Sequence, residues 1–143
     1  MPDTTLVVCP HCDATVRVAT ARLGDGPRCG ACHEALFAAA PVSLDEARFR
    51  HHLARGGLPL LVDFWASWCG PCHAMAPEFH AAARELEPGM RLAKVSTEAA
   101  PHLAAELGIR SIPTLILFRD GREAARHAGA LSARRIVAWA RAA

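Results

Sequence analysis

The chain of 143 residues contains six cysteines, and all of them fall into pairs with the spacing Cys-x-x-Cys. The three pairs are Cys9/Cys12, Cys29/Cys32 and Cys69/Cys72. Two intervening residues allow both sulfurs to bind one metal ion, or allow them to form a disulfide within a single turn of the chain. The first question is therefore which pairs bind metal and which carry out thiol–disulfide exchange.

The first two pairs favour a metal site. Sixteen residues separate Cys12 from Cys29, a spacing typical of zinc sites in which two tight turns contribute two thiolates each. Residues 1–34 hold few large apolar side chains, and a segment this small needs a metal or disulfides to fold. We predict a structural or regulatory zinc ion bound by Cys9, Cys12, Cys29 and Cys32. The alternative is that these cysteines form surface disulfides.

The third pair favours redox chemistry. Cys69 follows the apolar run 60–65, which predicts a buried parallel strand, and precedes a predicted helix over 71–86. Free amides and the dipole at a helix start stabilise an anion, so the Cys69 thiol should ionise readily. Pro71 suits a helix start because it lacks an N–H. We predict that Cys69 attacks and that Cys72, one turn on and more enclosed, resolves; the alternative is half of a zinc site.

A proton acceptor for Cys72 is available in the preceding strand. Asp63 is the single charged residue in the run 60–65. Burial of a carboxyl group disfavours its charged form and raises its pKa toward neutrality. We therefore predict that Asp63 takes the proton that Cys72 must lose.

The remaining pattern predicts an α/β domain. Ser43 and Glu46 have the spacing of a capping box, which predicts a helix that runs to about Arg55. Further elements are predicted by apolar runs, turn residues and caps: strands at 15–19, 91–95, 114–118 and 122–127, and helices at 101–107 and from Ser132 to about Trp139. This order predicts a sheet of four or five strands between helices. Five histidines are interpreted as surface residues: 51, 52, 80, 102 and 127.

Residues 40–143 resemble the thioredoxin family. The similarity covers the segments 62–66, 109–114, 118–121 and 129–132 as well as Trp68-Cys69-Gly70-Pro71-Cys72. It implies a thioredoxin fold, in which a central mixed sheet is flanked by helices. It also implies that Pro113 is cis beside the cysteines and that Lys94 lies near Asp63. Trp68, which flanks the active turn, is interpreted as covering the substrate surface; the alternative is that it only packs at the strand end. Electrons would come from NADPH through the partner enzyme thioredoxin reductase, and NADPH would not bind this chain directly.

Two places depart from the family pattern. His73 stands where many members have Lys or Arg, and Ser96-Thr97-Glu98 stands where many have Asn and Asp. A zinc module ahead of the domain resembles the bacterial thioredoxin 2 subfamily. We therefore expect a zinc-binding module over 1–36 and a thioredoxin domain over 37–143, acting together as a protein-disulfide reductase. Oxidase or isomerase activity, or a binding module that uses the domain as a scaffold, are the alternatives.

Composition and charge give no support for nucleic acid or a membrane as a partner. The 16 basic and 14 acidic residues are scattered and give a net charge of +2, which provides no electrostatic basis for binding nucleic acid or an anionic membrane. No run approaches the ~18 apolar residues of a membrane span. The amino terminus lacks the basic and apolar regions of a secretory signal. We expect a monomer that reduces protein disulfides in the cytoplasm.

Overall fold

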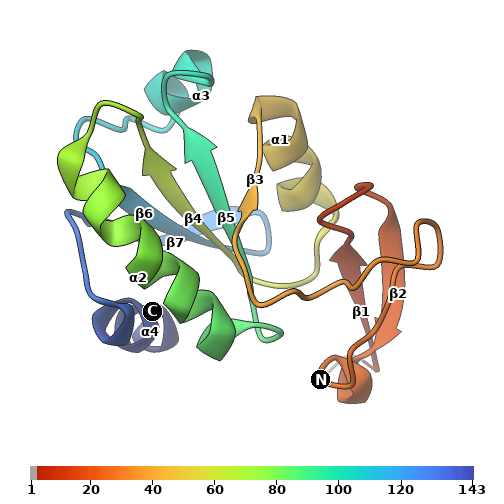
Figure 1. The fold of residues 1–143 in the computed structure, drawn as a ribbon. Helices are drawn as coiled ribbons and strands as arrows, with labels where there is room; N and C mark the ends of the chain where they lie inside the picture. Colours follow the sequence, from red (N-terminus) through yellow and green to blue (C-terminus); the bar gives the residue numbers. More distant parts are fainter. Residues whose placement is uncertain (1–2) are drawn as a thin grey trace.

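The computed structural model describes residues 3–143, which form a small sheet followed by a larger one (Figure 1). Strands β1 (Thr4–Val8) and β2 (Thr15–Ala19) pair antiparallel, with Val8 opposite Thr15. A short 3₁₀ turn, η1 (Thr20–Arg22), follows β2. The strand at 15–19 was predicted, whereas β1 was not.

The larger sheet has, within residues 3–143, five strands in the order β3-β5-β4-β6-β7. Their bounds are β3 Val42–Ser43, β4 Leu60–Trp65, β5 Arg91–Ser96, β6 Thr114–Arg119 and β7 Arg122–Ala128. β3, β5 and β4 run parallel, and β6 and β7 are antiparallel additions. This is the mixed sheet flanked by helices that the sequence predicts.

Helices cover both faces of this sheet (Figure 1). They are α1 Glu46–Arg55, α2 Gly70–Leu86, α3 Pro101–Glu106 and α4 Ala133–Ala142. Leu61 of β4 packs in one apolar cluster with α2 and α4, whereas Val62 and Phe64 pack in another with α1 and α3. Both faces of β4 are therefore buried, which explains its nearly continuous apolar sequence.

Local signals place most element ends correctly. Ser132 caps α4 by accepting a hydrogen bond from the Arg135 amide at 3.3 Å. The predicted Ser43 cap of α1 is wrong, because Ser43 pairs with β5 in β3, and Asp45 accepts the capping bond from the Arg48 amide at 2.8 Å instead. Asp120 has positive φ at the β6–β7 turn, as the hairpin prediction requires.

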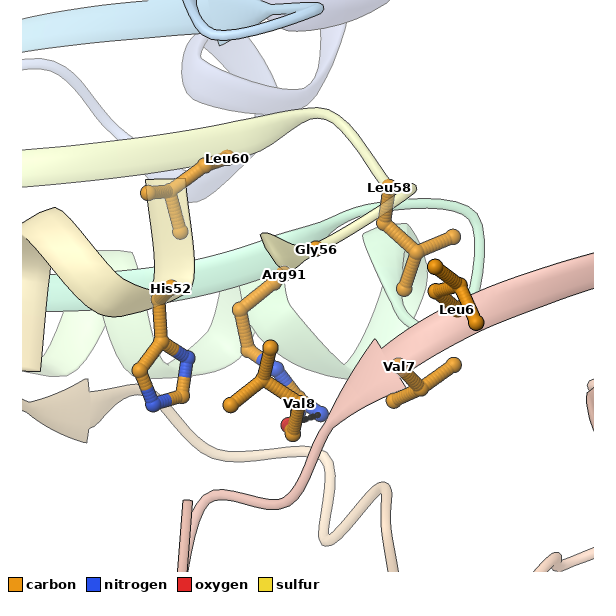
Figure 2. A pocket seen from close by; sticks show the side chains of 8 residues that line it. All are labelled: Leu6, Val7, Val8, His52, Gly56, Leu58, Leu60 and Arg91. Atoms are coloured by element: carbon orange, nitrogen blue, oxygen red, sulfur yellow. Dashed lines mark hydrogen bonds between the residues drawn. The ribbon is translucent and has the colours of Figure 1, made fainter. Parts of the chain in front are cut away.

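A buried arginine joins the two sheets. Arg91, at the start of β5, pairs with the buried Glu87 at 3.0 Å and donates to the backbone oxygens of Leu36 at 2.8 Å and Val8 at 3.3 Å. Figure 2 shows Arg91 reaching from β5 to Val8 at the end of β1, beside a small cavity of about 20 Å³. These bonds attach the amino-terminal segment to the larger sheet through its backbone carbonyl groups.

A second contact joins helix α1 to the first cysteine turn. Arg48 donates to both carboxylate oxygens of Asp13 at 2.8 and 2.9 Å and to the carbonyl oxygen of Pro10 at 2.9 Å. His52 lies 2.9 Å from Asp13 and is only 5 % exposed, so its interpretation as a surface residue is wrong. The hydrogen bonds from Arg48 and His52 lower the pKa of Asp13 to about 2, which keeps this contact ionic.

Candidate active site and metal centre

Cys69 and Cys72 lie where β4 gives way to α2, at the carboxyl end of the parallel strands. Cys69 is the N-cap residue of α2, and Pro71 occupies the first turn of the helix. The structure holds the two cysteines as a disulfide with their Cα atoms 5.3 Å apart. The strand–turn–helix placement predicted for this pair is confirmed.

The helix start acts on Cys69 directly. The Cys72 amide donates a hydrogen bond to the Cys69 sulfur at 3.2 Å, and the same bond would stabilise a thiolate at Cys69 once the disulfide is reduced. The two residues differ little in exposure, at 4 % for Cys69 and 2 % for Cys72. In this disulfide-bonded state the two sulfurs therefore differ in hydrogen bonding rather than in exposure.

Asp63 is buried on the same side of the sheet as α2. Side chains alternate along β4, and Leu61, two residues before Asp63, packs against α2 and α4. Asp63 is 0 % exposed, and neither carboxylate oxygen has a hydrogen-bond partner among residues 3–143. Burial raises the pKa of Asp63 to about 7, and the nearby positive charge of Lys94 opposes part of that rise. A carboxyl group with this pKa can accept and release a proton at neutral pH.

Lys94, Trp65 and Trp68 lie near this centre. Lys94 lies opposite Asp63 in the parallel register of β4 and β5, and its Nζ lies 4.9 Å from the ring centroid of Trp65. Trp65 is half-buried, whereas Trp68 is 73 % exposed beside Cys69. Trp68 therefore presents an exposed apolar surface next to Cys69.

The start of β6 supplies the other side of the centre. The Ile112–Pro113 peptide bond is cis, and Pro113 is buried. Ile112 packs against the two cysteines, and its carbonyl oxygen lies 3.6 Å from the Cys69 sulfur. The segment predicted to flank the cysteines does so.

The four amino-terminal cysteines form a separate centre. Cys9 and Cys29 begin two matching turns, in which the amides of His11 and Ala31 donate to their sulfurs at 3.4 and 3.3 Å. Each turn ends at a residue with positive φ, which is Asp13 in the first and His33 in the second. Cys9 and Cys29 are buried, and Cys12 is exposed. The two turns therefore present their sulfurs to one point.

The geometry of these sulfurs fits a zinc ion. The sulfurs lie 3.6 Å apart in the pairs Cys9/Cys32 and Cys12/Cys29, and all four lie within 4.8 Å of one another. Tetrahedral zinc with Zn–S bonds of about 2.3 Å requires edges of about 3.8 Å. Amide hydrogen bonds to two sulfurs would stabilise thiolate charge. The donor set and its spacing thus suit structural zinc.

Comparisons with known proteins match both parts of the chain. The family profile described as Thioredoxin matches residues 40–142, and the one described as Thioredoxin 2, N-terminal, matches residues 8–34. Thioredoxin C-3 of Corynebacterium nephridii is 42% identical over 94% of this chain and 92% of its own length. Thioredoxin of Porphyra purpurea is 47% identical over 53% of this chain and 71% of its own.

Structural similarity agrees with the sequence matches. The crystal structure of chloroplastic thioredoxin z superposes with a TM-score of 0.65 at 28% identity, and the match covers 70% of this chain and 90% of that one. Within residues 3–143, no helix combines the length and the apolar character that crossing a membrane requires. The architecture, the cysteine pair and the four-cysteine cluster thus agree with the resemblance noted from the sequence.

Proposed function

The chain belongs to the thioredoxin family and is a thiol–disulfide oxidoreductase, and we propose that it reduces disulfides in cytosolic proteins through Cys69 and Cys72. The observation that carries this proposal is the Cys72 amide donating to the Cys69 sulfur at the start of α2, with the buried Asp63 carboxyl on the same side of the sheet. This arrangement supplies a stabilised thiolate and a proton acceptor together.

The reaction would proceed in two exchanges. The Cys69 thiolate attacks one sulfur of the substrate disulfide, forms a mixed disulfide and releases the other sulfur as a thiolate. Cys72 gives its proton to the Asp63 carboxylate and attacks the Cys69 sulfur. The second substrate thiolate leaves, and two electrons have passed from the cysteine pair to the substrate. The Cys69–Cys72 disulfide remains, and Asp63 passes the proton that it took from Cys72 to a departing substrate thiolate.

Each neighbouring residue has a proposed part in these exchanges. Gly70 and Pro71 form the first turn of α2, which sets the spacing of the two sulfurs. Pro113 would leave the adjacent main chain free to pair with an extended substrate. Lys94 would moderate the pKa of Asp63, since its charge favours the carboxylate form. Trp68 would contact the substrate polypeptide.

We further propose that residues 1–36 form a zinc module and residues 37–143 the redox domain. Leu36 and Phe37 pack with the module's buried cysteines, and Val42 starts the larger sheet, so the change from one unit to the other falls near this boundary. Four thiolates held for zinc favour a reducing compartment such as the cytoplasm. Thioredoxin reductase, supplied by NADPH, would regenerate the dithiol.

The test is reduction of insulin disulfides with NADPH and thioredoxin reductase. We expect turnover with the natural chain and none with Cys69→Ser, because the mixed disulfide cannot form. The Cys72→Ser variant should instead accumulate a mixed disulfide, visible by mass spectrometry. Undiminished turnover in Cys69→Ser would contradict the proposed mechanism.

A further inference from the structure

The turn at residues 66–69, which ends at the attacking cysteine, is held by backbone hydrogen bonds. The Cys69 amide donates to the Ala66 carbonyl oxygen at 3.2 Å, which leaves Ser67 and Trp68 at the centre of the turn. Trp68 is 73 % exposed, so packing against the core holds little of its side chain. Its position beside Cys69 is therefore set by whatever fixes the backbone of this turn.

Every polar group of Ser67 has a partner. Oε1 of Glu98 accepts hydrogen bonds from the Ser67 amide at 2.5 Å and from its hydroxyl at 2.7 Å. Nε2 of His73 lies 2.6 Å from the Ser67 carbonyl oxygen, and since a carbonyl only accepts, Nε2 carries the donated hydrogen. The hydroxyl and amide of Ser67 lower the pKa of Glu98, which is a carboxylate at neutral pH.

The loop after β5 holds the turn at a second point. The Thr97 amide donates to the Trp65 carbonyl oxygen at 2.8 Å, and the Thr97 hydroxyl donates to the same oxygen at 3.2 Å. The His73 and Trp65 rings also pack edge to face, with centroids 6.3 Å apart. In Figure 1 the end of β4, the start of α2 and α3 lie at one end of the sheet.

The two positions that depart from the family pattern thus converge on one residue. His73 and Glu98 are far apart in the sequence, yet both bind Ser67, and Thr97 also binds Trp65, two residues before Ser67. We call the contacts of Ser67 with Glu98 and His73 the Ser67 clamp. The clamp shares no hydrogen bond with the Cys72 amide, which is the group that donates to the Cys69 sulfur.

We propose that Glu98 and His73 are positioning residues for protein substrates, because they hold Ser67 and thereby fix Trp68 as a docking surface next to Cys69. This inference rests on the proposed reductase function. Loosening the clamp lowers the fraction of molecules in which Trp68 is ready to receive a polypeptide, and apparent affinity falls by that fraction. A small disulfide reagent needs no such surface, and the part of its reaction that Cys69→Ser removes reports the reactivity of Cys69.

The experiment uses the full chain, reduced beforehand and freed of reductant, in single-turnover reactions without reductase. One arm varies the concentration of insulin, and the other uses the small disulfide 5,5′-dithiobis(2-nitrobenzoate). The variants are Glu98→Ala and Glu98→Gln, since the glutamine amide oxygen can still accept both bonds from Ser67. Glu85→Ala, which removes an exposed glutamate near the end of α2, is the matched control.

For Glu98→Ala we expect the half-saturating insulin concentration to rise about fivefold, with the maximal rate and the small-disulfide rate changed by less than about twofold. Glu98→Gln should restore most of the insulin affinity, and Glu85→Ala should match the natural chain. His73→Ala should repeat the Glu98→Ala pattern independently, and His73→Gln, which keeps a donor for the Ser67 carbonyl, should restore it.

Three results would overturn the inference. The first is unchanged insulin affinity in both alanine variants. The second is an equal loss with insulin and with the small disulfide, which would mean that the clamp acts on Cys69 or on folding. The third is failure of Glu98→Gln to restore affinity, which would assign the effect to charge. A natural chain that reduces neither substrate would instead refute the reductase function itself.

Discussion

Asp63→Asn should stabilise the protein, and the gain should grow with pH. The Asp63 carboxyl is fully buried, and its oxygens have no hydrogen-bond partner within residues 3–143. Burial raises its pKa from 3.8 to about 7, despite the charge of Lys94. The folded state therefore resists ionisation that the unfolded chain undergoes freely. An asparagine of nearly the same shape stays neutral at every pH and avoids this cost.

The size and sign of the effect follow from these two pKa values. Below pH 3.8 the carboxyl is protonated in both states, so the variant gains nothing. Between pH 3.8 and 7 only the unfolded chain ionises, and the natural protein loses about 1.4 kcal/mol per pH unit. Above pH 7 both states are ionised and the loss levels off. We expect a gain of about 2 kcal/mol at pH 5.5 and about 4 kcal/mol at pH 8.5.

Urea unfolding followed by circular dichroism at pH 4, 5.5, 7 and 8.5 measures this gain. The Cys69–Cys72 pair is kept oxidised, so that neither thiol titrates, and each variant is compared with the natural chain at the same pH. Asp120→Asn is the control, because Asp120 is an exposed turn residue and asparagine tolerates its positive φ. A gain that is constant from pH 4 to 8.5, or absent at pH 8.5, would refute burial of the charge as its cause.

Two further predictions concern the module and its attachment. Arg91→Ala leaves a buried glutamate and two carbonyl oxygens without their partner. It should lower the free energy of unfolding, measured in urea, by about 3–5 kcal/mol. Replacement of the exposed Arg84 by alanine, the control, should lower it by less than about 0.5 kcal/mol. Native mass spectrometry of the reduced chain should show one bound zinc ion, which Cys12→Ser removes and Cys69→Ser/Cys72→Ser does not. Loss of the ion from the latter variant would reverse the assignment of the cysteine pairs.

Features encoded by neighbouring residues could be predicted from the sequence. The cysteine turn, the Ser132 cap and the β6–β7 hairpin each depend on a few adjacent positions, and the structure places all three as predicted. The four-cysteine cluster was predictable because zinc ligation imposes its own spacing. The unpredicted β1 had a weak local signal in the short apolar run Leu6-Val7-Val8. This run identifies a strand only once its pairing with β2 is known.

Contacts between distant segments could not be predicted in this way. Arg91 binds backbone oxygens 55 and 83 residues away. Every residue carries a backbone carbonyl group, so the sequence does not indicate which of them a distant arginine will bind. A histidine in a helix resembles a surface residue, and His52 was interpreted as one. A signal did exist, because His52 lies three residues after the buried Phe49 and so shares its face of α1. The missing information was Asp13, the partner that makes burial of His52 possible.

Asp63 combines a locally predictable feature with an effect of the whole fold. Its proposed role in proton transfer explains why a residue that lowers folding stability remains in the core. Its burial was predictable from the apolar run that surrounds it, and its pKa follows from that burial. The packing of β4 between two layers of helices stabilises the fold and, by the same contacts, destabilises the carboxylate. A less buried aspartate would destabilise the fold less. It would, however, stay ionised near pH 7 and would be a poor acceptor for a thiol proton. Asp63→Asn should therefore gain stability and slow the second exchange together. If the variant were more stable and equally fast in resolving the mixed disulfide, the buried carboxyl would have no part in the reaction.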